Sequence, residues 1–269
     1  MSTSSFKIAH KLLTGAGAIE QLAAELTRLD VDNPLIVTDA ALVKSGTVAL
    51  ALEHLGERPY EIFDRVLPDP EISIVEDCMQ AYRDGGHDGL IGLGGGSAID
   101  IAKSVAAYAG YHGALADLFG VDQVPRKGPP LIAIPTTAGT GSEVTNVAIL
   151  SDKVAQLKKG IVSDYLLPDV ALISPQMTLT CPRSVTAASG VDALVHAIES
   201  YLSLNASPIT DALAIGAIKL IAKALPKAYA NPANLQARDD MATASLMAGM
   251  AFGNAGVGAV HALAYPLGG

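Results

Sequence analysis

Three side chains in the last third of the chain could bind one divalent metal ion. Asp192 and His196 are four residues apart, so on a helix their side chains would share one face. His261 follows a glycine-rich stretch and offers a third ligand. A carboxylate with two imidazoles suits a borderline ion such as Fe(II) or Zn(II) and leaves room for a substrate. The competing interpretation, and the commoner one for an isolated Asp/His pair, is an ion pair on a helix surface.

A glycine turn further upstream could bind a diphosphate. Residues 94–97 (GGGS) lie between a predicted strand and a predicted helix. Gly95 and Gly96 would let the backbone approach a phosphate, and the N–H groups at the start of a helix favour an anion. Ser97 could donate its hydroxyl or cap the helix, and Asp100 could bind a nucleotide hydroxyl or favour the helix dipole. The spacing differs from the G-x-G-x-x-G fingerprint and is equally compatible with a tight turn that binds no ligand.

A second polar turn, residues 135–143 (PTTAGTGSE), follows another predicted strand. Its hydroxyls and backbone donors, including those of Thr136, Thr137 and Ser142, should lie at the same carboxyl edge of a parallel sheet. Ligands of such sheets bind at that edge. The alternative is a flexible loop in which Ser142 or Thr140 caps a helix. Two such turns after two strands favour a nucleotide site.

A carboxylate, Asp39, follows the first apolar run. At the end of a strand it could accept hydrogen bonds from the adenosine ribose and repel a 2′-phosphate, which would favour NAD over NADP. Taken alone, the residue fits better as the N-cap of the helix that follows it.

Two kinds of structure must position these residues. Up to about residue 180, short apolar runs alternate with segments of helical spacing, which predicts a mainly parallel, Rossmann-like sheet with helices on both faces. The strands are expected at 35–38, 60–63, 89–93 and 131–134, and the helices at 40–55, 74–83 (capped by Ser73) and 98–109. Only helices are expected beyond residue 181, at 184–203, 209–224 and 238–252, with joints at Pro208, Pro226 and Pro232. We therefore predict a dinucleotide-binding α/β domain over residues 1–180 and a partial all-helical metal-binding domain over residues 181–269.

The composition excludes several classes of protein. Half of the residues are hydrophobic and 17% are charged, which is typical of a folded globular enzyme. The net charge of -9, without a basic stripe, argues against a nucleic-acid partner. No apolar stretch is long enough to span a membrane, and no secretory signal precedes the first predicted strand. The two cysteines are too few for a disulfide framework, so a reducing, cytoplasmic location is expected.

Taken together, the segments resemble the iron-containing (group III) alcohol dehydrogenase family. The resemblance runs from about residue 8 to the last residue and is carried by four ordered motifs: GGGSAID (94–100), IPTTAGTGSEVT (134–145), DALVHAIE (192–199) and HALAYPLGG (261–269). It implies a metal-dependent, NAD-linked dehydrogenase that interconverts an alcohol and its aldehyde or ketone. It also implies an α/β cofactor domain, an all-helical metal domain and a homo-oligomer, a dimer or larger.

The resemblance assigns roles to individual positions. The ligands of Fe(II) or Zn(II) would be Asp192, His196 and His261. Lys158 would reach the nicotinamide-side ribose, and Asp69 replaces the Asn of a Pro-Asn-Pro turn near the cofactor. The full set of cofactor-binding residues would be Asp39, Asp69, Gly95, Gly96, Ser97, Asp100, Thr136, Thr137, Ser142 and Lys158. Tyr265 stands where many members have a histidine near the reacting carbon, and it could join a proton relay or only fill that space.

The chain departs from the family pattern near its end. The family has a fourth ligand, a histidine shortly beyond the segment of His261, followed by a long helical bundle, so the chain is expected to be C-terminally truncated. Alternatives within the family are a hydroxyacid–oxoacid transhydrogenase or another reductase. Alternatives of other classes are a carbon–oxygen lyase of the dehydroquinate-synthase type and an inactive fragment. Net NADH formation from simple alcohols would exclude the lyase, which regenerates its cofactor in each cycle.

Overall fold

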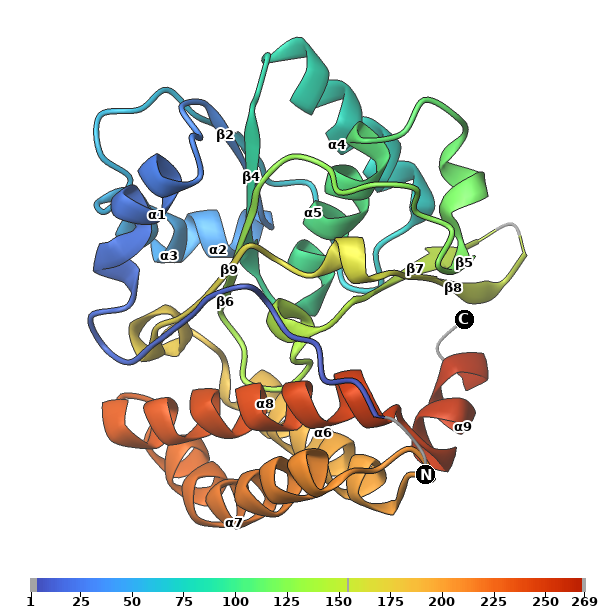
Figure 1. The fold of residues 1–269 in the computed structure, drawn as a ribbon. Helices are drawn as coiled ribbons and strands as arrows, with labels where there is room; N and C mark the ends of the chain where they lie inside the picture. The colour runs from blue at the N-terminus through green and yellow to red at the C-terminus, as the bar shows by residue number, and fades with distance from the viewer. Residues whose placement is uncertain (1–3, 154, 268–269) are drawn as a thin grey trace.

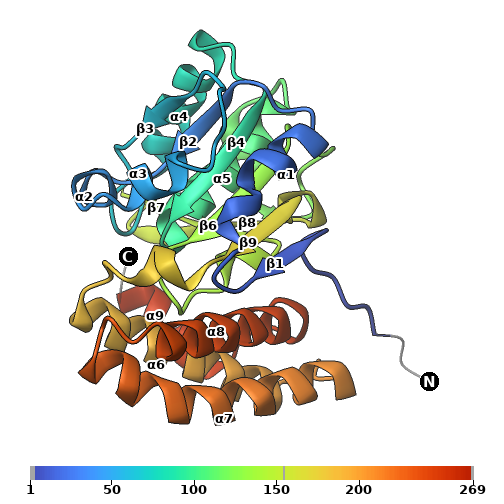
Figure 2. The ribbon, with the colours of Figure 1, turned by 90° about the vertical axis from the view of Figure 1, so that its left-hand side faces the viewer.

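The N-terminal part of the computed structural model is built on a six-stranded parallel sheet (Figures 1 and 2). The structure describes residues 4–153 and 155–267, with side chains as far as residue 264. In the spatial order β1-β9-β6-β4-β2-β3, the strands are β1 (Leu12–Thr14), β9 (Val170–Ile173), β6 (Leu131–Pro135), β4 (Gly89–Gly94), β2 (Pro34–Val37) and β3 (Glu61–Phe63). The parallel α/β architecture that the sequence predicted is thereby confirmed.

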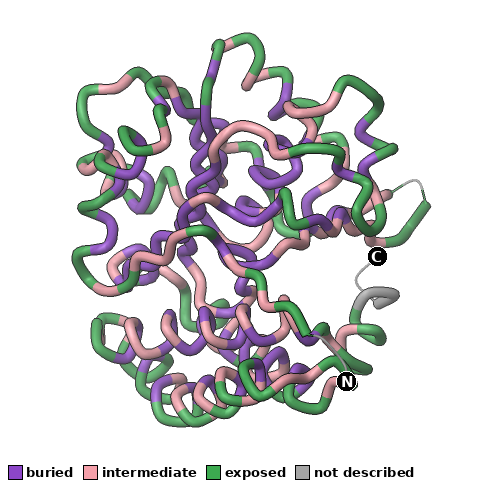
Figure 3. Tube along the Cα trace, in the orientation of Figure 1, coloured by how far each residue is buried: buried purple, intermediate pink, exposed green. Residues whose placement is uncertain are grey.

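Helices cover both faces of this sheet because alternate residues of each strand point to opposite sides. Leu35 and Val37 of β2 pack into one hydrophobic cluster with α4 (Ile72–Asp84) and α5 (Gly96–Ala109). Ile36, between them, packs into a second cluster. That second cluster includes side chains of α1 (Leu22–Arg28) and α3 (Thr47–Leu52). The central strands are consequently buried over their whole length, as Figure 3 shows.

Several predicted elements were wrong in detail. The single helix expected at 40–55 is two short helices, α2 (Ala40–Lys44) and α3, because Gly46 between them has a left-handed φ of 82°. Ser73 does not cap α4, which begins at Ile72 after Glu71. Pro226 is not a joint but lies inside α7 (Pro208–Ala230). Its alanine neighbours at 224 and 228 are buried in the helical core, and this packing outweighs the lost backbone hydrogen bond.

An antiparallel hairpin was not expected from the sequence. It consists of β7 (Val147–Asp152) and β8 (Leu157–Val162), and β5 (Gly120–Val121) pairs with β8 as a third strand. Ala148 and Leu150 of β7 belong to the hydrophobic cluster that contains α5. This contact carries Ile149 and Lys158 to the carboxyl edge of the main sheet.

Four helices follow and lie beneath the carboxyl edge of the sheet (Figure 1): α6 (Arg183–Leu202), α7, α8 (Leu235–Ala255) and α9 (Ala259–Leu267). Their core is mostly alanine, with Ala193, Ala197 and Ala217 fully buried, so the helix axes can approach closely. The predicted domain boundary at residue 181 falls between the short 3₁₀ helix η5 (Pro175–Thr178) and α6. Among the described residues, no helix combines the length and apolar character needed to cross a membrane.

Candidate functional site

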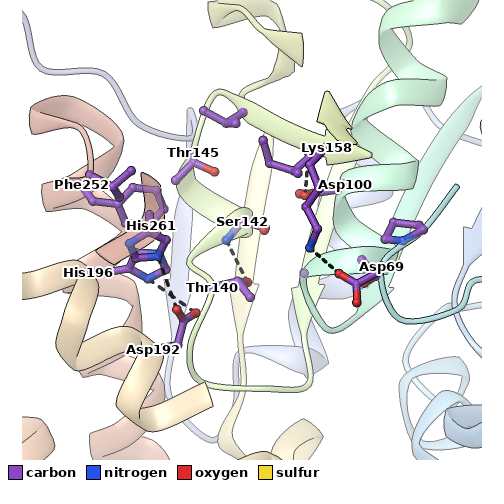
Figure 4. A pocket seen from close by; sticks show the side chains of 16 residues that line it. Asp69, Asp100, Thr140, Ser142, Thr145, Lys158, Asp192, His196, Phe252 and His261 are labelled. Carbon is purple, nitrogen blue, oxygen red and sulfur yellow. Dashed lines mark hydrogen bonds and ion pairs between the residues drawn. The ribbon is translucent and has the colours of Figure 1, made fainter. Parts of the chain in front are cut away.

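The three predicted metal ligands lie together at the end of the helical layer (Figure 4). Asp192 and His196 come from α6 and His261 from α9, and one ligand atom from each lies within 4.8 Å of the others. A carboxylate oxygen of Asp192 is 3.7 Å from Nδ1 of His196, and the other is 3.5 Å from Nε2 of His261. The pair on α6 is therefore more than a local ion pair, because His261, from a helix far along the chain, lies beside it.

Aromatic stacking holds His196 in place. Its ring lies between Phe252 of α8 and His261, with centroid distances of 4.1 and 4.4 Å and nearly parallel planes. Nδ1 lies 3.3 Å from the carbonyl oxygen of Gly139, which can only accept a hydrogen bond, so the Nδ1–H tautomer fits. Burial lowers the pKa of His196 and favours the neutral imidazole that metal coordination requires.

The glycine turn connects β4 to α5 at the carboxyl edge of the sheet. Gly95 is the N-cap of α5, and Ser97 lies within the first turn of the helix, so its predicted capping role was wrong. The turn packs against the second polar loop, since a Cβ on Gly96 would be 2.8 Å from Cγ2 of Thr140. Gly95, Gly96 and Thr137 line a cavity of about 580 Å³ that extends to Asp192. The turn thus has the backbone form and the open space that a bound diphosphate needs.

The second polar loop is more buried than the sequence suggested. Thr136 is only 3% exposed, and its N–H donates to the carbonyl oxygen of Gly94, which ties the two turns together. Ser142 begins a short 3₁₀ helix, η3 (Ser142–Val144), whose N-cap is Gly141, so neither Ser142 nor Thr140 occupies the predicted cap position. Thr140 does accept a long hydrogen bond from the N–H of Ser142.

A second cavity of about 400 Å³ joins the two groups of residues. Its lining includes Asp192, His196 and His261 from the cluster, together with Ser97 and Asp100. The last two belong to what we call the cofactor edge, which is the two polar turns (residues 94–97 and 135–143) with the first turns of α5, where the sequence predicts a nucleotide. Asp100 is aimed into this region with one oxygen, Oδ1, that is buried and has no hydrogen-bond partner among the described residues. Its other oxygen accepts from the N–H of Ile149 at 3.0 Å. Burial raises the pKa of Asp100, although the charge of Lys103 and hydrogen bonds from Ile149 and Ser142 act in the opposite direction.

The remaining predicted residues fall into three groups. Asp69 and Lys158 line the shared cavity and pair with each other at 2.5 Å, and Asp69 has the left-handed φ of 52° that Asp tolerates. Asp39 caps α2 by accepting from the N–H of Leu42 at 2.9 Å, and it does not line either cavity. The side chain of Tyr265 lies outside the described residues, so its role stays a prediction.

Two buried charges near the cofactor edge were missed. Lys103 of α5 is fully buried and donates to the carbonyl oxygens of Thr145 at 2.8 Å and Val147 at 3.0 Å. Burial lowers its pKa to about 8, and burial raises the pKa of the neighbouring Glu143 carboxyl to about 7. Lys103 thereby fastens the segment that follows the second loop to α5, and the charge of Glu143 acts on it from the end of that loop. The helical spacing from Asp100 to Lys103 was the only sequence signal for them.

Comparisons with known proteins match the whole architecture. The profile of the iron-containing alcohol dehydrogenases matches residues 9–175, and that of the C-terminal part of the same family matches residues 186–269. A long-chain-alcohol dehydrogenase of Geobacillus thermodenitrificans is 49% identical over 260 residues, covering 95% of this chain and 65% of its own length. An NAD-dependent methanol dehydrogenase of Bacillus methanolicus is 38% identical over 99% of this chain and 70% of its own.

A solved structure shows the same arrangement. Sulfoacetaldehyde reductase from Bifidobacterium kashiwanohense, determined in complex with NAD+, superimposes with a TM-score of 0.94 at 33% identity. The match covers 99% of this chain and 71% of that one. The chain therefore spans roughly two thirds of the length of the relatives that it matches, for example 65% of the Geobacillus protein.

Proposed function

The chain belongs to the iron-containing alcohol dehydrogenase family, and from this premise we propose that its protein transfers hydride between an alcohol and NAD. The products would be the corresponding aldehyde or ketone and NADH. The observation that carries the proposal is the shared cavity, in which Asp192, His196 and His261 line one part and Ser97 and Asp100 line another.

The donor set fits a divalent metal ion. One carboxylate and two imidazoles converge within 4.8 Å, and burial keeps His196 neutral. Asp192, His196 and His261 would hold the ion, and iron is favoured over zinc by the family to which the chain belongs. When bound, the ion would supply Lewis acidity that lowers the pKa of an alcohol.

The carboxyl edge of the sheet fits NAD. Gly95 and Gly96 would hold the diphosphate at the N-terminus of α5, and Thr137 would line the cavity beside them. The unpartnered oxygen of Asp100 is a ready acceptor for a donor group of the nucleotide. When bound, NAD would supply the hydride acceptor. Asp39 would favour NAD over NADP in addition to capping its helix.

The side chains of the cavity would orient the substrate and limit its size. Phe252 fixes the ring of His196 by stacking and supplies an apolar wall. Lys158 and Asp69 add a paired charge, which favours a polar or short alcohol near that end. We also propose, from the family resemblance, a homo-oligomer in the cytoplasm, for which size-exclusion chromatography and cell fractionation are the tests.

The test is to assay the purified chain for bound metal and for NADH formation. After anaerobic loading with Fe(II) or Zn(II), we expect one ion per chain and net NADH formation from primary alcohols. His196→Ala should abolish both. An unchanged metal content in this variant would refute the site. Metal and NAD binding without net NADH formation from any alcohol would contradict the dehydrogenase proposal and leave the lyase and the inactive fragment as the alternatives.

A further inference from the structure

Glu199 connects the two helices that carry the metal cluster, although neither spacing nor resemblance assigned it a role. It lies on α6 one turn beyond His196, on the same face, and is 7% exposed. Oε2 is 2.5 Å from Nδ1 of His261, and Oε1 accepts from the N–H of Val260 at 2.6 Å. The two oxygens therefore hold the first turn of α9 and the side chain that this turn presents.

The contact with Glu199 determines which ring nitrogen of His261 carries the proton. A carboxylate can only accept a hydrogen bond, so Nδ1 of His261 carries the proton that it donates to Glu199. Nε2 lies 3.5 Å from Asp192, so it faces the other two predicted ligands and is the nitrogen that can coordinate an ion in this tautomer. Outer carboxylates of this kind hold metal-binding histidines in many proteins by setting the tautomer and the ring angle.

The contact with the backbone explains why α9 begins where it does. The N–H groups in the first turn of a helix have no partner within the helix, and Oε1 of Glu199 supplies one to Val260. A Cβ on Gly258 would lie 3.0 Å from the same oxygen, so glycine at this position permits the close approach. The glycine-rich segment before His261 thus leaves room for the Glu199 carboxylate of α6.

We propose that Glu199 is a positioning residue for the metal site, acting through His261 and not through the metal or substrate directly. The inference rests on the proposed metal site. It predicts that removing the carboxylate weakens metal binding even though all three ligands remain in the chain.

The experiment compares Glu199→Gln with wild type by titrating the metal-free chain with Zn²⁺ against a chromophoric chelator. The Gln oxygen can still accept from Val260 while its NH₂ group faces Nδ1 of His261, which selects the Nε2–H tautomer and occupies the coordinating nitrogen. We expect the Zn²⁺ affinity to fall by about 10- to 100-fold, with the melting temperature of the metal-free chain nearly unchanged. Glu76→Gln, at an exposed position of α4, is the matched control and should match wild type.

Two further variants separate the possible outcomes. Glu199→Ala should lose both the cap and the orientation of His261, so it should melt at a lower temperature and bind Zn²⁺ no better than Glu199→Gln. In a His261→Ala background, Glu199→Gln should cause no further loss of affinity. The inference would be overturned if Glu199→Gln lowered the Zn²⁺ affinity equally in the His261→Ala background. It would also be overturned if Glu199→Gln and Glu199→Ala both bound Zn²⁺ as tightly as wild type. Failure of the wild-type chain to bind Zn²⁺ would instead overturn the proposed metal site.

Discussion

The predicted cofactor edge and the predicted metal-binding cluster line one cavity, but they are built in opposite ways. The cofactor edge is mainly backbone: two turns, each following a strand, brought together by the register of β4 and β6. The cluster is made of side chains, and its ligands come from α6 and from α9, which lies far along the chain. The first region is fixed once the sheet forms, whereas the second depends on contacts made by particular side chains.

Glycines connect the two regions. A Cβ on Gly139 of the second loop would lie 2.6 Å from the carbonyl oxygen of Ser189 in α6. A Cβ on Gly141, whose φ is left-handed, would lie 2.5 Å from the Cα of Gly249 in α8. The backbone of the second loop therefore packs directly against the backbones of α6 and α8. This close approach places the carbonyl oxygen of Gly139 next to His196.

The largest effect should come from removing a ligand. Asp192→Ala should weaken metal binding by more than the roughly 100-fold that the loss of an outer partner can cost, because a direct donor and its charge disappear. NAD affinity should change little, since the glycine turn is local to β4 and α5. Metal titration and NAD titration of the same preparation test the separation. Parallel losses of both affinities would show that the two regions do not bind independently.

A substitution at the junction should affect both regions at once. Gly139→Ala should lower stability by about 1–3 kcal/mol, because the new methyl group meets backbone that cannot move freely. It should also weaken both metal and NAD binding, unlike Asp192→Ala. Gly17→Ala is the control, since its Cβ would meet nothing closer than 4.0 Å. Urea unfolding measures the stability. If Gly139→Ala is as stable as the control, the backbone contact is not close in solution.

The buried charges of the cofactor edge predict a pH dependence. Burial raises the pKa of Glu143 in the folded chain to about 7 from 4.5, so the folded state holds a proton over this range that the unfolded state releases. The contribution of Glu143 to stability should therefore decline as the pH rises from 4.5 to 7. Glu143→Gln should remove this decline. Urea unfolding midpoints measured at several pH values should differ increasingly between wild type and Glu143→Gln. A constant difference between the two proteins across this pH range would contradict the prediction.

The smallest predicted effect on stability separates two roles of Asp39. Asp39→Ala should cost about 1 kcal/mol through the lost cap of α2, while Asp39→Ser should keep most of this stability because serine also caps. Both variants remove the carboxylate and should raise the use of NADP relative to NAD. Thermal melting and the ratio of the two cofactor affinities are the measurements. An unchanged ratio would mean that Asp39 only caps the helix.

The sequence predicted best what is local. The parallel strands, the glycine turn and the helical pair Asp192 and His196 are encoded by neighbours in the chain, and the structure contains all of them. It predicted poorly what depends on tertiary contact. The hairpin of β7 and β8 went unrecognised because only Ala148 and Leu150 of β7 are buried, which leaves a short apolar pattern. Gly46 looked like an ordinary helical residue.

The buried polar groups were the hardest to predict. Glu199 and Lys103 resemble exposed helical charges in the sequence, and only the docking of α9 and of the hairpin gives each its partners. The spacing of Glu199 from His196, three residues on a helix, was a signal for a shared face. No local sequence pattern could show that His261 of α9 would pack against that face of α6.

The proposed hydride transfer requires the metal-binding cluster to face the nicotinamide half of NAD, and this requirement has a direct test. NAD can be bound to the chain loaded with paramagnetic Co(II), and the relaxation of its protons measured by NMR. We expect much faster relaxation of the nicotinamide C4 proton than of the adenine protons, and loss of this difference in His196→Ala. Equal relaxation at both ends of NAD, or a difference that persists in the variant, would contradict it.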